Sequence, residues 1–206
     1  MINFYNMDCM DHMAKCKDNA YDLAIVDPPY NLQRFKNGIG KNDRHKVKTK
    51  NTLWNNNAPK ENYFKELFRI SKNQIIWGAN NFILPPTEYF CIWNKKQTVD
   101  NFATAEYAWV SMGLKKPAKI FDYGIHKHNH TNKIHPTQKP VKLYEWLLMN
   151  YANEGDKILD THLGSGSIAI ACHNLGFDLT ACELDKEYFD ASMKRLNDHK
   201  LQQKLF

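Results

Sequence analysis

The sequence places a carboxylate, two prolines and an aromatic ring in immediate succession, at Asp27-Pro28-Pro29-Tyr30. The acid follows residues 23–26, an apolar run typical of a short buried strand. Because proline cannot continue the hydrogen-bond ladder of a sheet, the chain must leave the sheet here. The stiff turn presents one carboxylate, carbonyl groups with no neighbouring donor, and the Tyr30 ring. These groups could bind a ligand, or they could form an ordinary strand-ending turn with a surface acid.

A second stretch, residues 157–185, has the pattern of a nucleoside-cofactor site. A strand pattern ends at Asp160, residues 164–169 fit G-x-G-x-x-G/A, a helical pattern follows, and a second strand pattern ends at Glu183. Glycines let the backbone approach a ligand, and Glu183 could accept hydrogen bonds from ribose hydroxyls. The alternative is a glycine turn needed only for helix–sheet packing. Because the unit comes late in the chain and a dehydrogenase has no use for D-P-P-Y, an adenosine-based methyl donor is favoured over a nicotinamide.

Strand and helix patterns alternate along the chain, which predicts an α/β fold with a mainly parallel sheet. Strands are expected at residues 2–6, 23–26, 74–77, 89–93, 105–112, 157–160 and 179–183. Helical spacing occurs at 64–68 and 143–151, with Pro140 suited to a first turn, and Gly176 marks a helix stop. The last helix is expected to start after Asp185. Residues 31–60 are too long and polar for an ordinary connection, so a functional or mobile loop is predicted.

The positive charge is concentrated in two segments. The net charge is +6, yet residues 31–60 hold eight Lys or Arg and one acid, and residues 113–142 hold seven Lys and one acid. Two basic segments on a slightly acidic body indicate a polyanionic partner, and nucleic acid is favoured. The candidate DNA-binding residues are Arg34, Lys36, Lys41, Arg44, Lys46, Lys48, Lys50, Lys127 and Asn129.

Composition excludes several classes of protein. The 206 residues, 43% of them hydrophobic, predict one folded domain. No targeting segment and no apolar run near 18 residues is present, so a cytoplasmic protein without membrane contact is expected. The five cysteines are scattered without C-x-x-C, which argues against disulfides and zinc. His126, His128 and His130 alternate as in a strand; phosphate contacts are favoured over a metal site, and no metal is expected.

On these motifs the chain resembles the permuted, beta-class amino-group DNA methyltransferases, specifically the adenine-N6 enzymes of D-P-P-Y type. The shared segments are Asp8 in "YNMDCM", residues 27–30, "IIWGANNF" (75–82), "CIWNK" (91–95), "IHPTQKP" (134–140), residues 160–166 and Glu183. The resemblance implies a circularly permuted Rossmann-like, S-adenosylmethionine-dependent methyltransferase fold, with a mainly parallel seven-stranded sheet and helices on both faces. It further implies a single domain over 1–206, with a basic loop insertion at 31–60 and a small target-recognition segment at 113–134. Strand 2–6 would then lie beside the strand that ends at Glu183.

The resemblance also assigns roles. An exocyclic amino group of a flipped base would be held by the Asp27 carboxylate and the Pro28 carbonyl, with Tyr30 stacked on the base. The implied catalytic residues are Asp27, Pro28, Pro29 and Tyr30. The implied contacts to S-adenosylmethionine are Asp8, Cys9, Asp27, Lys139, Asp160, Leu163, Gly164, Gly166, Glu183 and Leu184, with Lys139 near the methionine carboxylate and Thr137 a weaker candidate. Trp77 and Trp93 are expected in the core.

The leading hypothesis is therefore adenine-N6 methylation of double-stranded DNA, and three alternatives stay open. Cytosine-N4 transfer also acts on an exocyclic amine, although Asp27 favours adenine because the cytosine enzymes more often resemble Ser-Pro-Pro-Tyr. RNA or protein-glutamine methylation is less favoured. The chain could instead be a catalytically idle nucleic-acid-binding protein of the same fold. Covalent attack on cytosine is excluded, since no cysteine follows a proline. Specificity would be short, shared with residues 31–60, or assembled across a homodimer.

Overall fold

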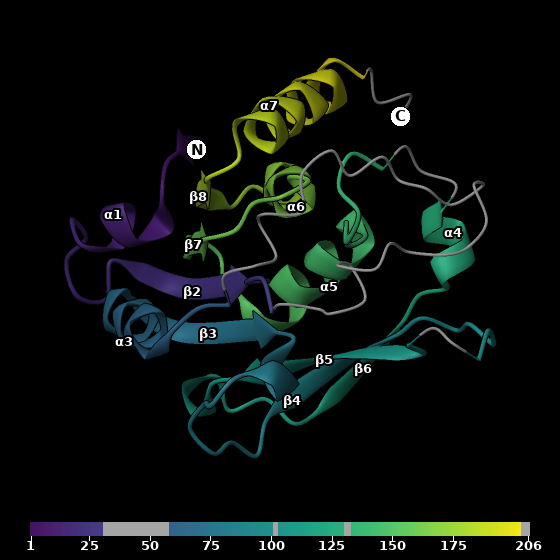
Figure 1. Ribbon diagram of the computed structural model, residues 1–206, viewed down its shortest axis with the longest axis horizontal. Helices are drawn as coiled ribbons and strands as arrows, with labels where there is room; N and C mark the ends of the chain where they lie inside the picture. Colours follow the sequence, from purple (N-terminus) through teal and green to yellow (C-terminus); the bar gives the residue numbers. More distant parts are fainter. Residues whose placement is uncertain (31–57, 101–102, 130–132, 203–206) are drawn as a thin grey trace.

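The structure, a computed structural model, describes residues 1–30, 58–100, 103–129 and 133–202, and its centre is one mixed sheet (Figure 1). The strands are β1 (Ile2–Asn6), β2 (Tyr21–Val26), β3 (Ser71–Trp77), β4 (Phe90–Asn94), β5 (Ala105–Val110), β6 (Lys119–Asp122), β7 (Lys157–Asp160) and β8 (Asp178–Glu183). Their order across the sheet is β1-β8-β7-β2-β3-β5-β4-β6. All seven predicted strands are present: β1 and β7 have the predicted ends, and the ends of the others differ by up to three residues.

Helices cover both faces of the sheet, as predicted (Figure 1). They are α1 (Cys9–Met13), α3 (Glu61–Ile70), α4 (Ile125–Asn129), α5 (Val141–Tyr151), α6 (Ser167–Leu175) and α7 (Lys186–Leu201), with short 3₁₀ turns η3 (Ala79–Asn81) and η4 (Met112–Leu114). Alternate residues of β2 point to opposite faces of the sheet. Leu23 and Ile25 belong to the hydrophobic cluster that includes residues of α5 and α6, whereas Ala24 and Val26 belong to the one that includes residues of α1 and α3. This alternation explains why the strands read as continuous apolar runs.

The two ends of the sequence meet in the sheet. β1 pairs in parallel with β8, and Asn6 lies opposite Glu183. The terminal ammonium group of Met1 forms an ion pair with Asp178 at the start of β8. The pairing of strand 2–6 with the strand that ends at Glu183, which the permuted order predicts, is therefore confirmed.

The helix-end signals in the sequence are confirmed. Pro140 directly precedes α5 as its N-cap residue. Gly176 ends α6 in the left-handed conformation (φ 77°), which a glycine adopts without a steric penalty. The side chain of Asp185 accepts hydrogen bonds from the backbone N–H groups of Glu187 and Tyr188 and so caps α7. Trp77 and Trp93 are buried in the core, as expected.

Two expectations for residues 113–134 were wrong. The sheet has eight strands, because residues 119–122 form β6 and pair in parallel with β4. The β3–β5 and β4–β5 pairings are antiparallel, so this half of the sheet is mixed. His126 and His128 lie on the short helix α4, His130 lies outside the described residues, and the buried His128 bonds to the carbonyl oxygen of Gln138 at 2.6 Å. Burial lowers the pKa of His128 to about 4, so this imidazole is neutral and does not suit a phosphate contact.

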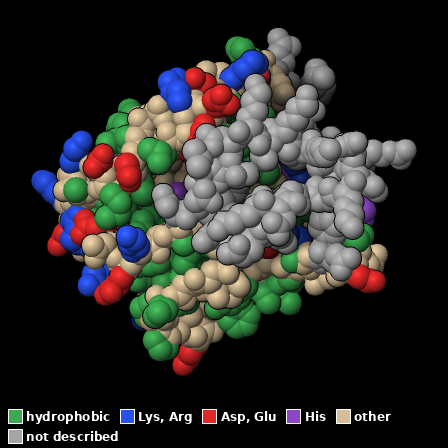
Figure 2. All heavy atoms as spheres, viewed as in Figure 1, with side chains coloured by type: hydrophobic (Ala, Val, Ile, Leu, Met, Phe, Trp, Pro, Cys, Tyr) green, Lys and Arg blue, Asp and Glu red, His purple; other side chains and the backbone are tan. Residues whose placement is uncertain are grey.

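Most of the predicted DNA-binding residues lie outside the part of the chain that the structure describes. These are the seven basic residues from Arg34 to Lys50, whereas Lys127 is exposed on α4. On the face shown in Figure 2, the described Lys and Arg side chains are interspersed with Asp and Glu. Among the described helices, none is both long and apolar enough to cross a membrane.

Candidate active site

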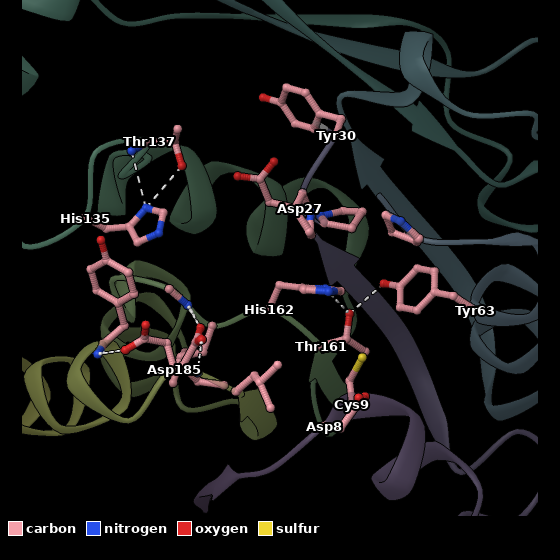
Figure 3. Close-up of a pocket in the computed structure, with 18 of the residues that line it drawn as sticks. Asp8, Cys9, Asp27, Tyr30, Tyr63, His135, Thr137, Thr161, His162 and Asp185 are labelled. Carbon is pink, nitrogen blue, oxygen red and sulfur yellow. Dashed lines mark hydrogen bonds between the residues drawn. The ribbon is translucent and has the colours of Figure 1, made fainter. Parts of the chain in front are cut away.

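A cavity of about 920 Å³ opens where β1, β2, β7 and β8 end (Figure 3). Ligand sites in open α/β sheets form at the carboxyl ends of strands in this way. The predicted site residues that line it are Asp8, Cys9, Asp27, Pro28, Pro29, Tyr30, Lys139, Leu163, Gly164, Glu183 and Leu184. Asp27 and Tyr30 lie toward one end, and Asp8 and Cys9 toward the other (Figure 3).

The Asp27–Tyr30 turn is held by a contact that the sequence analysis did not identify. Gly78, directly after β3, is left-handed (φ 66°), and a Cβ atom there would lie 2.6 Å from Cε1 of Tyr30. The Tyr30 ring also meets Phe82 edge-on, with ring centroids 6.4 Å apart. Only a glycine leaves room for the ring at this point, so the "WGAN" segment positions Tyr30.

The carboxylate of Glu183 is fixed by two backbone groups. Its Oε2 accepts a hydrogen bond from the N–H of Gly164 at 2.8 Å, and its Oε1 accepts one from the N–H of Asp185 at 2.9 Å. Burial raises the pKa of Glu183, and these two hydrogen bonds act in the opposite direction. Each oxygen keeps a further lone pair, so the carboxylate can still accept hydrogen bonds from a diol.

At the end of the cavity away from Asp27 and Tyr30, Asp8 has a structural role in addition to its position in the lining. Its carboxylate accepts a hydrogen bond from the N–H of Met10 at 2.8 Å and caps α1. Burial and the neighbouring Asp8 charge raise the pKa of Cys9 to about 12, so its thiol is neutral. Neutral Cys9 is suited to apolar contact and not to nucleophilic attack.

Asp160 and Gly166 do not line the cavity, although the sequence suggested cofactor contacts for both. A Cβ atom on Gly166 would lie 3.0 Å from Cβ of Ser192, so this glycine permits close packing of the loop against α7. Asp160 is buried behind the lining and accepts a hydrogen bond from the N–H of His162 at 2.9 Å. Burial, with the nearby charges of Asp27 and Glu183, raises the pKa of Asp160 to about 8.

Lys139 lines the cavity, but its ammonium group binds protein carboxylates. It donates to Oδ2 of Asp27 and lies 3.1 Å from Oε2 of Glu106. Although burial disfavours the charged form, these two carboxylates raise the pKa of Lys139 well above its usual value. The sequence predicted a contact to the methionine carboxylate instead, and Glu106 was not identified as a site residue.

The lining also holds polar and aromatic residues to which the sequence assigned no role, apart from Thr137 as a weaker cofactor candidate, and Tyr63 and Tyr188 lie outside every shared segment. The hydroxyl groups of Tyr63 and Thr161 are 2.6 Å apart, and Nδ1 of His162 lies 2.9 Å from the Thr161 hydroxyl oxygen (Figure 3). The His135 ring meets Tyr188 edge-on at 4.4 Å, and the Thr137 hydroxyl lies 3.1 Å from Nδ1 of His135. Burial lowers the pKa of His162 and of His135 to about 4, so both rings are neutral near pH 7.

Comparisons with known proteins agree with this geometry. The Type II methyltransferase M2.MboI of Moraxella bovis is 26% identical over 96% of this chain and 88% of its own length. The crystal structure of the M1.HpyAVI–SAM complex superposes with a TM-score of 0.62 at 21% identity, covering 95% of this chain and 100% of that one. The PvuII DNA methyltransferase, described as cytosine-N4-specific, gives a TM-score of 0.60 at 13% identity, covering 96% and 90%. Residues 47–194 match the family model of the N6/N4 DNA methylases, and this chain therefore belongs to that DNA methylase family.

Proposed function

We propose that this DNA methyltransferase transfers a methyl group from S-adenosylmethionine to the exocyclic N6 amino group of adenine in double-stranded DNA. The observation that carries the proposal is the state of the Asp27 carboxylate. Its Oδ2 accepts from Lys139, whereas its Oδ1 is buried and has no hydrogen-bond partner among the described residues. A buried acceptor without a donor is costly, so a donor supplied by the substrate would complete the site.

The chemistry of the turn fits an amino-group substrate. The lone pair of an exocyclic amine is delocalised into its ring, so the amine needs acceptors that hold its two hydrogens during attack on a methyl carbon. Asp27 Oδ1 and the Pro28 carbonyl serve as these acceptors in the proposed complex. Pro29 keeps the turn rigid, and Tyr30 stacks on the base that has left the duplex.

The cofactor end of the cavity fits an adenosine-based methyl donor. S-adenosylmethionine, when bound, supplies a methyl group on a positively charged sulfur. Glu183 accepts hydrogen bonds from the ribose, Gly164 leaves space for the cofactor because it has no side chain, and Asp8 accepts from the adenine amino group. The cavity volume of about 920 Å³ is within the usual range for sites that hold a ligand of this size.

Cytosine-N4 transfer is the second candidate. The fold likeness to a cytosine-N4-specific enzyme favours it, since both bases present an exocyclic amine to the same acceptors. Asp27 favours adenine through the D-P-P-Y pattern. We further propose that the recognition sequence is short and that residues 31–60 and 113–134 contact the duplex.

The test is to incubate the purified protein with unmethylated duplex DNA and S-adenosylmethionine and to analyse the nucleosides by mass spectrometry. N6-methyladenine supports the proposal, and N4-methylcytosine supports the second candidate. If neither base appears while the protein still binds duplex DNA, the idle-binder alternative is correct. Sequencing methylated DNA from cells that express the protein then gives the recognition sequence.

A further inference from the structure

Asp27 is the first of four charged side chains that form a row of alternating sign. Lys139 bridges Oδ2 of Asp27 and Oε2 of Glu106, and Oε1 of Glu106 forms an ion pair with Lys95 at 2.6 Å. The four residues come from four parts of the fold: the end of β2, the segment before α5, strand β5 and the loop after β4. The row is neutral overall, because two ammonium groups balance two carboxylates.

The inner part of this row is not a surface ion pair. The side chain of Lys139 is 2% exposed, and its ammonium group lies 5.4 Å from the centre of the Trp77 ring. An ammonium group in this environment must be paired, since an isolated buried charge would be strongly destabilising. Glu106 supplies the second partner, so Lys139 is held from both sides and cannot turn away from Asp27.

The consequence appears at Asp27. With Oδ2 bound by Lys139, the carboxylate plane has a defined orientation, and Oδ1 is left as the acceptor at the substrate end. We propose that Glu106 is a positioning residue for methyl transfer: it holds Lys139, and Lys139 in turn orients Asp27 toward the target amino group. This inference rests on the proposed function and adds to it a residue that touches neither cofactor nor base.

The charges of the row also shift the pKa of Asp27. Burial raises the pKa of Asp27, Lys139 and Lys95 lower it, and the like charge of Glu106 raises it. Among the described residues, further titratable groups that interact electrostatically with Asp27 are Asp160 at the end of β7, Tyr63 on α3 and Tyr144 on α5. Loss of the Glu106 charge should therefore lower the pKa of Asp27, whereas loss of the Lys139 charge should raise it.

The experiment compares Glu106→Gln with Lys139→Met in the full chain. The pKa of Asp27 is followed by carbon NMR of its carboxyl group, assigned with Asp27→Asn, and is expected to move in opposite directions in the two variants. In Glu106→Gln, kcat should fall roughly 10- to 100-fold, which is the scale of a small misplacement of a reacting group. KM for DNA and Kd for the cofactor should each change less than about threefold, because Glu106 touches neither ligand. Glu106→Asp, which keeps the charge, should recover part of kcat. The double variant should be no slower than Lys139→Met alone.

Glu145→Gln is the matched control, because Glu145 is also an ion-paired glutamate with little exposure, but its partners are Lys142 and Asn174 and not Lys139. It should leave kcat and the Asp27 titration unchanged. If the wild type is active and Glu106→Gln has the same kcat and the same Asp27 pKa as the wild type, the inference is overturned and the proposed function stays intact. An inactive wild type would overturn the proposed function, while the NMR titration still tests the row. If Glu106→Gln does not fold, Lys95→Met is used instead, because it removes the other ion-pair partner of Glu106. An unchanged kcat in Lys95→Met would also overturn the inference.

Discussion

At the scale of single residues, the two oxygens of Asp27 have different partners, and removal of the carboxylate should affect catalysis much more than cofactor binding. Asp27→Ala should lower kcat by at least about 100-fold, the scale seen when one group that stabilises a transition state is removed. Cofactor affinity should be retained, because Glu183 lies on a different strand and has its own backbone partners. Activity assays and calorimetry measure the two effects. Asp11→Ala, at an exposed acid on α1, is the control, and a kcat within tenfold of wild type for Asp27→Ala would remove Asp27 from the mechanism.

Glu183 should show the opposite behaviour. Glu183→Ala removes a charged acceptor from the cofactor end and should weaken S-adenosylmethionine binding by about 1–3 kcal/mol. Calorimetry measures this directly, with Glu154→Ala as a control at an exposed glutamate outside the cavity. Equal affinity in both variants would contradict the role of Glu183 in binding the ribose.

Asp160 should make stability depend on pH. Its pKa of about 8 in the folded protein lies above the value of about 3.9 for an unfolded chain, so the folded state holds the extra proton between these pH values. The free energy of unfolding should therefore fall as the pH rises from about 4 to about 8. Asp160→Asn keeps an acceptor for the His162 N–H and should remove this slope.

Urea unfolding of wild type and Asp160→Asn at pH 5, 6, 7 and 8 tests the prediction. The stability difference should grow in favour of the variant with pH, by at most about 1.4 kcal/mol per pH unit. Asp11→Asn serves as the control for an exposed acid. A constant difference across this range would mean that Asp160 is ionised throughout.

At the scale of elements, the turn after β3 positions the turn after β2. Gly78→Ala should displace Tyr30, because the added Cβ would lie 2.6 Å from its ring, and kcat/KM for DNA should fall. Gly155→Ala is a matched control: Gly155 also has a positive φ, 85°, but has no atom within 4 Å of the new Cβ. Both changes bring a similar backbone cost of about 1–2 kcal/mol. Equal kcat/KM in the two variants would show that Gly78 serves only its own turn.

The elements themselves could largely be predicted from the sequence, and the exceptions have physical causes. β1 and β7 have the predicted ends, since their apolar runs stop at polar residues. β6 was not predicted: its sequence resembles that of β7, but it is an edge strand without a fully buried residue, and its pairing with β4 is set by tertiary contacts. The alternating histidines would share one face in a strand, whereas His126 and His128 lie on the helix α4 and His128 bonds to Gln138, ten residues away.

At the scale of the whole molecule, the motifs predicted many residues that line the cavity but not the contacts among them. Asp8, Asp27 and Glu183 could be found because each lies at or just after the end of a strand, and parallel strands bring their carboxyl ends together. The partners of Lys139 could not be found, because Asp27 is 112 positions away and Glu106 has no local pattern that marks it. The role of Gly78 could not be predicted either, because a side chain at this position is excluded only by the Tyr30 ring that packs against it in the folded protein.

The charge distribution of the whole chain leads to the last prediction. If Lys46, Lys48 and Lys50 contact phosphates, their replacement by Ala should flatten the log–log salt dependence of DNA binding by up to about 2.7, at about 0.9 for each contact. Binding to target and scrambled duplexes should weaken alike, because phosphate contacts position a protein without reading sequence. Fluorescence anisotropy at several salt concentrations measures both effects.

The control for this triple variant is Lys186→Ala combined with Lys194→Ala on α7. These exposed lysines are paired with Asp190 and Asp198, so their loss should leave the salt slope nearly unchanged. Changes at Lys127 or Asn129, within the proposed recognition segment, should instead alter which sites are methylated. An unchanged slope for the triple variant on both duplexes would mean that the basic charge of residues 31–60 does not hold the phosphate backbone, and that affinity comes from elsewhere in the chain.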